Sequence, residues 1–213
     1  MGEPARTPQA RAASAGGGPP RRPRRSKSLP KVVSREEMKA WIRAAYARSV
    51  RDGGLVTLAY FTAARRSELA GMKWEGWDEP RRTLRFWRPK NKDWHEVDLH
   101  PDAMEALVRL RLALRLTRIA LTATGPIFRG QRGPLTVEGV RGIVGRSGRD
   151  AGIPADKARP HVLRHTRAYL LLEDGYGVDV VQQVLGHADV STTSLYLHVS
   201  RGRVAEAMNG SGL

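Results

Sequence analysis

Apolar side chains recur at helical spacing through most of the chain, starting near residue 34. Ser34 and Glu37 stand three positions apart, as in a capping box, in which each side chain satisfies a free amide at a helix start. The next residues, from Met38 to Ala45, place their large apolar members on one face of a helix. We therefore expect the folded domain to begin with a helix at Ser34.

The same periodicity predicts further helices. We expect them over residues 55–63, from residue 67 onward, and over residues 102–116, 136–148, 161–173, 178–185, 191–199 and 201–208. In the helix 161–173, the spacing turns Leu163, Leu170 and Leu171 toward the core.

The period changes between residues 83 and 99. Residues 83–87 and 95–99 alternate apolar and polar side chains, which is typical of strands, and residues 89–93 between them have turn composition. The predicted fold class is mainly α (α+β), a helical domain with one small antiparallel β-sheet.

Residues 1–33 differ from the rest of the chain. They hold eight basic residues and one acidic residue, with many prolines and glycines and few apolar side chains. Such a segment buries too little apolar surface to fold alone, so we expect a disordered basic tail over 1–33 and one domain over 34–213. The tail suits contact with a phosphate backbone, an organellar transit peptide or a plain linker equally well.

Charge and composition narrow the function. The 213 residues include 37 Lys and Arg against 21 Asp and Glu, a net charge of +16, which favours a polyanionic partner such as nucleic acid. The chain has no cysteine, which excludes disulfides and thiolate metal sites. No apolar run approaches the roughly 18 residues of a membrane span, so we expect no membrane partner.

Five residues suggest phosphodiester chemistry. Arg65 and Arg164 can each grip two phosphate oxygens, a phenolate from Tyr196 can attack phosphorus and leave again, and His161 and His187 can handle protons. Each residue alone has an ordinary explanation as a surface charge or a core side chain. The hypothesis of an enzyme that breaks and rejoins DNA depends on their combination.

The motifs around these residues resemble the catalytic domain of the tyrosine recombinases, the phage integrase family. That family writes Thr-Gly-Leu-Arg-x-Ser-Glu-Leu at its first arginine, and residues 62–69 keep Thr, Arg, Ser, Glu and Leu. Residues 161–166 match its His-x-Leu-Arg-His-Thr fully. Leu-Gly-His at 185–187, Ser-Thr-Thr at 191–193 and Tyr196 complete the pattern. The resemblance covers about residues 34–200.

The resemblance implies a role for each matching residue. Tyr196 would attack the scissile phosphate and give a 3′-phosphotyrosine. Arg65 and Arg164 would hold the nonbridging oxygens, with His161 as general base and His187 as a hydrogen-bond donor to the phosphate. The family's lysine lies in the hairpin turn and protonates the leaving 5′-oxygen, a role that fits Lys90 and, as an alternative, Lys92. Glu68 is expected to support Arg65.

The resemblance also implies partners. Double-stranded DNA is the substrate, no cofactor or metal is needed, and members associate as tetramers on paired DNA sites. The helical core-binding domain that usually precedes the catalytic domain is not expected in residues 1–33, so an accessory partner that supplies a clamp is a further expectation. We expect a bacterial cytoplasmic protein associated with the nucleoid.

Other functions remain open from the sequence. The chain is alternatively a non-catalytic or truncated DNA-binding remnant of an integrase. A type IB topoisomerase uses similar residues. A metalloenzyme with His161 and His165 as ligands is weakly supported, because Val162 stands where such zinc hydrolases carry a glutamate and no third ligand is evident.

Overall fold

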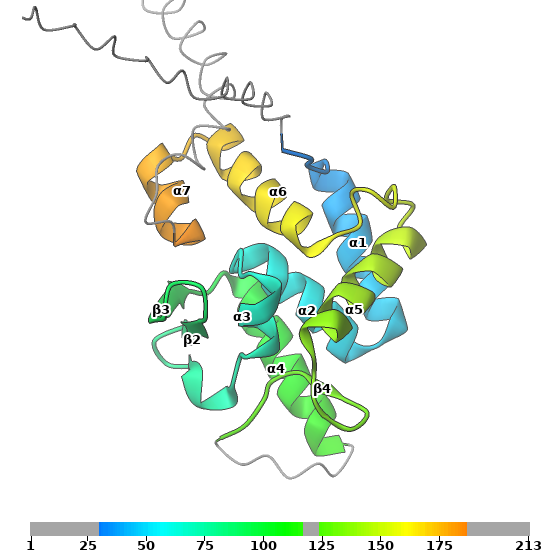
Figure 1. The fold of residues 1–213 in the computed structure, drawn as a ribbon, viewed down its shortest axis with the longest axis vertical. Coiled ribbons are helices and arrows are strands. Elements are labelled where there is room, and N and C mark those ends of the chain that lie inside the picture. The colour runs from blue at the N-terminus through cyan, green and yellow to red at the C-terminus, as the bar shows by residue number, and fades with distance from the viewer. Residues whose placement is uncertain (1–29, 117–123, 187–213) are drawn as a thin grey trace, which may run out of the picture.

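The computed structural model describes residues 30–116 and 124–186, and its elements follow one another as a helical domain with small antiparallel sheets (Figure 1). In chain order they are α1 (Arg35–Arg48), α2 (Val50–Phe61), α3 (Arg66–Ala70), a 3-10 helix (Trp74–Gly76), β1 (Trp77–Asp78), β2 (Thr83–Arg88), β3 (Asp93–Asp98), α4 (Pro101–Leu116), β4 (Arg129–Gly130), β5 (Gly133–Pro134), α5 (Val137–Asp150), α6 (Pro160–Glu173) and α7 (Val178–Leu185). The predicted fold class is confirmed.

Helix α1 begins as the sequence predicted. The Ser34 hydroxyl accepts a hydrogen bond from the Glu37 amide, and the Glu37 carboxylate accepts one from the Ser34 amide. Met38, Trp41 and Ala45 are buried along one face. The Trp41 indole donates to the Ser147 hydroxyl of α5 over 3.1 Å, which links the two helices in the core.

Helix α2 begins five residues before the predicted start at Leu55. Ser49 caps it by accepting from the Asp52 amide. The two glycines that follow are poor helix formers, but a Cβ on Gly53 would overlap the Tyr46 ring. The close packing of α1 on α2 therefore overrides the weak local preference for helix.

The expected hairpin forms the larger sheet, in the order β1-β2-β3. Strand β2 alternates buried and exposed side chains, and its last residue, Arg88, faces Asp93 across the pair. Strand β1 and the small β4–β5 hairpin were not predicted, because strands of two residues are too short to show a period.

Two apolar clusters position the helices. The larger one joins α1, α2, α4, α5 and the inner face of β2, with Trp41, Phe86 and Phe128 among its fully buried side chains. The smaller one packs α7 on α6 and includes Ala63, from the loop before α3, beside Ala168 and Leu185. The end of α7 and the start of α3 are thereby brought together. The predicted inward direction of Leu163, Leu170 and Leu171 is confirmed.

Several expectations lie outside the described residues. These are the helices over 191–199 and 201–208 and the tail over residues 1–29. Residues 30–33, the end of the expected tail, contact the domain: Val33 is buried, and its amide donates to the Thr166 hydroxyl. Among the described residues, no helix combines the length and the apolar character that crossing a membrane requires.

Candidate active site

A cavity of about 420 Å³ lies where α3, α5 and the start of α6 meet. Three of the residues singled out from the sequence, Arg65, His161 and Arg164, line it together. The rest of its lining consists of Ala64, Arg66, Arg141, Arg159 and Pro160. Five arginines and one histidine around a single cavity make it a site for an anion.

Arg65 is held by a buried carboxylate. It stands directly before α3, and Glu68, in the first turn of that helix, accepts from the Arg65 amide at 2.6 Å and from its Nη1 at 2.7 Å. Glu68 is almost fully buried, whereas the Arg65 side chain is 25% exposed. The buried end of this pair orients the guanidinium, and the exposed part faces the cavity.

The Arg164 side chain donates hydrogen bonds to two backbone segments that are far apart in the sequence. Its Nη1 donates to the carbonyl oxygen of Ala63 at 2.5 Å, and its Nη2 donates to that of Leu185, the last residue of α7, at 2.6 Å. The residue is only 9% exposed. Arg164 is therefore fixed between the first motif and the end of α7 while it still borders the cavity.

The backbone before Arg65 has a left-handed residue. Ala63 has a φ of +50° and is fully buried. This is the position at which the family motif has glycine, and an L-residue there carries some strain. Alanine thus keeps the backbone conformation that turns its carbonyl toward Arg164.

The first turn of α6 brings His161 and Arg164 onto one face, as their spacing of three predicts. Partial burial, and next the positive charges of Arg159 and Arg66, lower the pKa of His161. Its imidazole is therefore largely neutral near pH 7 and able to accept a proton. The positive end of the α6 dipole also points at this cavity.

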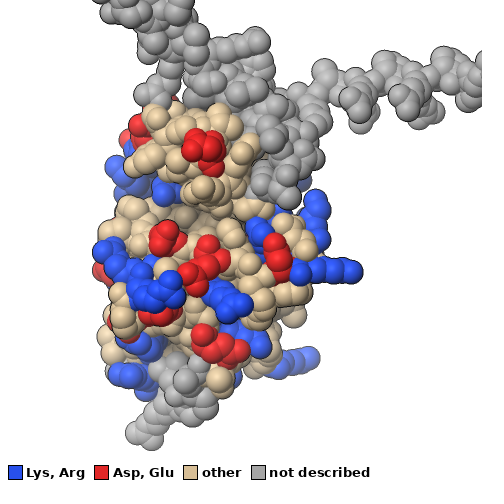
Figure 2. Space-filling model, turned by 90° about the vertical axis from the view of Figure 1, so that its left-hand side faces the viewer, with Lys and Arg blue, Asp and Glu red and all other residues tan. Residues whose placement is uncertain are grey.

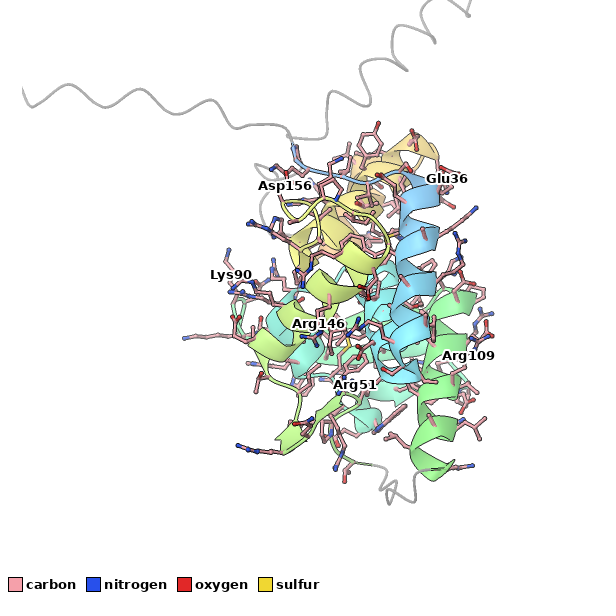
Figure 3. The ribbon with its side chains drawn as sticks, turned by 90° about the vertical axis from the view of Figure 1, so that its right-hand side faces the viewer. Glu36, Arg51, Lys90, Arg109, Arg146 and Asp156 are labelled. Atoms are coloured by element: carbon pink, nitrogen blue, oxygen red, sulfur yellow. The ribbon has the colours of Figure 1, made fainter. Side chains whose placement is uncertain are left out.

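A second basic cavity adjoins the first. It measures about 390 Å³, lies along the outer face of α5, and shares Arg141 and Arg159 with the first cavity. Arg146 and Arg149 also line it, and Figure 3 shows Arg146 on the α5 surface. The two cavities are therefore adjacent, and arginines line both of them. A larger hollow of about 880 Å³ beside the 3-10 helix has acidic and basic residues mixed and none of the candidate residues.

The two candidate lysines lie apart from this cavity, on the turn between β2 and β3. Both are exposed, and Lys92 has a φ of +56°. Figure 3 shows Lys90 at the edge of the molecule, on the side opposite α4. Neither lysine lines the cavity, so the described geometry does not choose between them.

His187 and Tyr196 lie outside the described residues. The chain reaches Gly186, which ends α7 in a left-handed conformation with a φ of +56°. Arg164 holds the carbonyl of Leu185, and Arg88 holds that of Gly186 at 2.8 Å. The residue that immediately precedes His187 is thus anchored by Arg88, next to the carbonyl that Arg164 holds.

The described residues offer little support for a metal site. No group of three or more His, Asp or Glu side chains suited to a metal occurs among them. His161 and His165 lie edge to face with ring centroids 5.8 Å apart. Burial, then the charges of His161 and Arg164, lower the pKa of His165 to about 4.

Three arginines of the cavity lining were not predicted from the sequence. Arg159 immediately precedes α6, Arg66 opens α3, and Arg141 lies on the exposed face of α5. In a chain with this many arginines, no local pattern distinguishes these three from solvated surface residues. The missed Arg88 had one available signal, because it occupies an inward position in an alternating strand.

Comparison with known proteins identifies the family. The model of the phage integrase family matches residues 31–203. Tyrosine recombinase XerC from Corynebacterium glutamicum is 31% identical over 192 residues, covering 88% of this chain and 60% of that protein. Tyrosine recombinase XerD from Staphylococcus aureus is 30% identical over 191 residues, with 88% and 64% covered. The chain thus spans about 60% of the length of these relatives.

Solved structures agree with the fold. The crystal structure of XerA recombinase superposes with a TM-score of 0.72 at 28% identity, covering 84% of this chain and 65% of that one. The integrase from mycobacterium phage Brujita superposes with a TM-score of 0.61 at 24% identity, covering 84% and 59%, which supports the fold alone. The cavity residues and these matches lead to one conclusion: the chain belongs to the phage integrase family, whose members include the tyrosine recombinases.

Proposed function

We propose that the chain is a site-specific DNA recombinase that cuts and rejoins strands through a 3′-phosphotyrosine intermediate. The observation that carries the proposal is the gathering of Arg65, His161 and Arg164 around one cationic cavity, in a member of this family. These residues lie up to a hundred positions apart in the sequence. A surface that binds DNA only through its positive charge does not need these three residues at one place.

The two motif arginines hold the scissile phosphate. During attack, phosphorus becomes pentacoordinate and negative charge grows on its nonbridging oxygens, which the guanidiniums of Arg65 and Arg164 neutralise. A well-placed donor of this kind contributes on the order of 3–4 kcal/mol to the transition state. Arg66, Arg141 and Arg159 add positive charge around the same cavity.

Each step replaces one phosphoester bond with another, so the reaction needs no external energy source. The Tyr196 oxygen forms a bond to phosphorus, the bond from phosphorus to the 5′-oxygen breaks, and Lys90 gives that oxygen a proton. His161 accepts the phenol proton and His187 donates a hydrogen bond to the phosphate. A 5′-hydroxyl from another strand then reverses these steps and releases the tyrosine. The phosphotyrosine conserves the bond energy, so neither ATP nor a metal is needed.

Double-stranded DNA is the proposed partner, and the basic cavities along α5 are the proposed path for its backbone. The net charge of +16 and the basic residues of the segment 1–33 add salt-dependent affinity. Self-association as a tetramer on paired sites, in the bacterial cytoplasm, belongs to the same proposal. So does an accessory partner that closes the DNA clamp.

The test is covalent trapping. A supercoiled plasmid that carries the DNA flanking the gene is incubated in EDTA with wild type or with Tyr196→Phe, and the reaction is stopped with SDS. The proposal predicts an SDS-resistant protein–DNA adduct with wild type alone. Tight DNA binding by both proteins without an adduct would instead support the remnant, a DNA-binding protein without strand cleavage.

A further inference from the structure

Arg88, at the end of β2, is a buried cation outside the cavity described above. The residue is 8% exposed, and it lies on the inner face of the strand, where Leu84 and Phe86 precede it. Burying a guanidinium costs desolvation free energy unless an opposite charge and hydrogen-bond acceptors surround it. We therefore expect its side chain to be hydrogen-bonded. Its partners come from two elements, the β2–β3 hairpin and the end of α7.

The first partner is Asp93, directly opposite on β3. Arg88 donates to both carboxylate oxygens, from Nε at 2.8 Å and from Nη2 at 2.5 Å. This bidentate geometry requires arginine, because a lysine ammonium has no planar group that donates two parallel hydrogen bonds. The hydrogen bond from Arg88 lowers the pKa of Asp93, so the pair stays charged across the neutral range.

The same two residues close the turn that carries Lys90. The Arg88 carbonyl accepts from the amides of Asn91 at 3.2 Å and Lys92 at 2.8 Å. Arg88 therefore fixes the turn with its backbone on one side and, through Asp93, with its side chain on the other. Lys90 follows Arg88 by two positions, so little freedom separates the lysine backbone from the guanidinium.

The second partner is Gly186, at the end of α7. Arg88 Nη1 donates to the Gly186 carbonyl at 2.8 Å. A Cβ at Gly186 would overlap Nη1 of Arg88, so glycine permits this approach as well as its own left-handed φ. The last carbonyl oxygens of a helix have no hydrogen-bond donor within the helix. Here two arginines donate to them: Arg164 to the carbonyl of Leu185 and Arg88 to that of Gly186.

One side chain thus connects the lysine turn to the residue before His187. We propose that Arg88 is a positioning residue for strand cleavage, which sets the hairpin turn with Lys90 at a fixed distance from the α7 end that leads into His187. The inference rests on the proposed function. Figure 2 shows the face of the domain on which the hairpin and α7 lie, with basic and acidic side chains interspersed.

The test uses the leaving group. The duplex site mapped with wild type is prepared with either a normal scissile phosphodiester or a 5′-bridging phosphorothioate, whose sulfur leaves without being protonated. If Arg88 positions Lys90, Arg88→Met slows adduct formation on the phosphodiester about 10- to 100-fold. On the phosphorothioate it reacts within about threefold of wild type, as Lys90→Ala does.

The control is Arg81→Met. Arg81 lies in the turn between β1 and β2, away from the lysine turn, and forms an exposed pair with Glu96 of β3 at 3.5 Å. We expect it to react like wild type on both substrates. Equal slowing of Arg88→Met on both substrates, or no slowing on either, would overturn the inference. If wild type forms no adduct on either substrate, the proposed function fails and the inference falls with it.

A second variant covers the case in which Arg88→Met does not fold, as thermal unfolding monitored by circular dichroism will show. Asp93→Asn keeps the volume of a side chain that is 44% exposed, and it removes the charge that orients Arg88. We expect a smaller loss confined to the phosphodiester substrate. Full activity of Asp93→Asn on both substrates would contradict the positioning role.

Discussion

The guanidinium of Arg164 donates to the carbonyl oxygen of Ala63, a residue 101 positions earlier in the chain. The same guanidinium donates to Leu185, so three motifs that are separate in the sequence meet at one side chain. Arg164 therefore has two functions to test: it supports the fold, and it borders the cavity proposed for the phosphate.

Arg164→Lys is expected to impair both. A single ammonium cannot reach both carbonyls and face the cavity, so one buried carbonyl loses its partner. We expect the free energy of unfolding to fall by about 2–3 kcal/mol in urea titrations, and adduct formation to fall by about 100-fold or more. Arg146→Lys, on the exposed face of α5, is the control and should change stability by less than about 0.5 kcal/mol. Unchanged stability of Arg164→Lys would refute the bridging role.

Ala63 allows a test of the left-handed backbone. In Ala63→Gly, relief of about 1 kcal/mol of strain is offset by the loss of a buried methyl worth about 0.8 kcal/mol, so stability should stay within about 1 kcal/mol of wild type. Ala63→Val places a branched side chain at a φ of +50° in a filled core and should cost more than about 2 kcal/mol. Chemical denaturation measures both, and a valine variant as stable as wild type would show that the backbone there is not left-handed.

Glu68→Gln tests how Arg65 is oriented. The amide side chain offers one acceptor oxygen where the carboxylate receives both the Arg65 amide and its Nη1. We expect a loss of about 1.5–3 kcal/mol in the free energy of unfolding. Adduct formation should also slow, because the guanidinium is no longer fixed. Glu138→Gln, an exposed carboxylate beside Arg66, is the matched control. Equal behaviour of the two variants would argue against a special role for Glu68.

Folding stability should depend on pH through His165. Its pKa is about 4 in the folded protein and about 6.5 when unfolded. Above about pH 6.5 the group is neutral in both states. As the pH falls from about 6.5 to 4, the unfolded state binds a proton that the folded state does not, so stability is lost.

Because His165 is partly exposed, solvent screening reduces the effect to the order of 1–2 kcal/mol. Urea titrations at pH 7.5, 6 and 4.5 measure it, and His165→Gln serves as the reference that cancels the contribution of the carboxyl groups. The difference in stability between the two proteins should change with pH in this window. A constant difference would mean that His165 titrates normally.

Much of the fold follows from local sequence. The capping residues at Ser34 and Glu37 and the alternation over residues 83–87 predict α1 and β2 because each signal lies within a few residues. The start of α2 could not be predicted in this way. Gly53 and Gly54 are poor helix formers by themselves, and the Tyr46 ring that requires Gly53 belongs to another helix.

The residues of the candidate site also fall into those that local sequence predicts and those that only the fold reveals. Motif spacing selected Arg65, His161 and Arg164, and the fold brings them to one cavity. Arg159 and Arg88 were missed because their importance comes from contacts: Arg159 borders a cavity that only the fold creates, and Arg88 reaches a carbonyl 98 positions away. Arginine-rich composition conceals such residues until their partners are known.

The chemical identity of the covalent link decides whether Tyr196 is the nucleophile. The SDS-resistant adduct is digested with protease and nuclease, and the nucleotide-bearing peptide is sequenced by mass spectrometry. We expect a nucleotide joined through its 3′-phosphate to Tyr196. A link to another residue, or one through a 5′-phosphate, would contradict it.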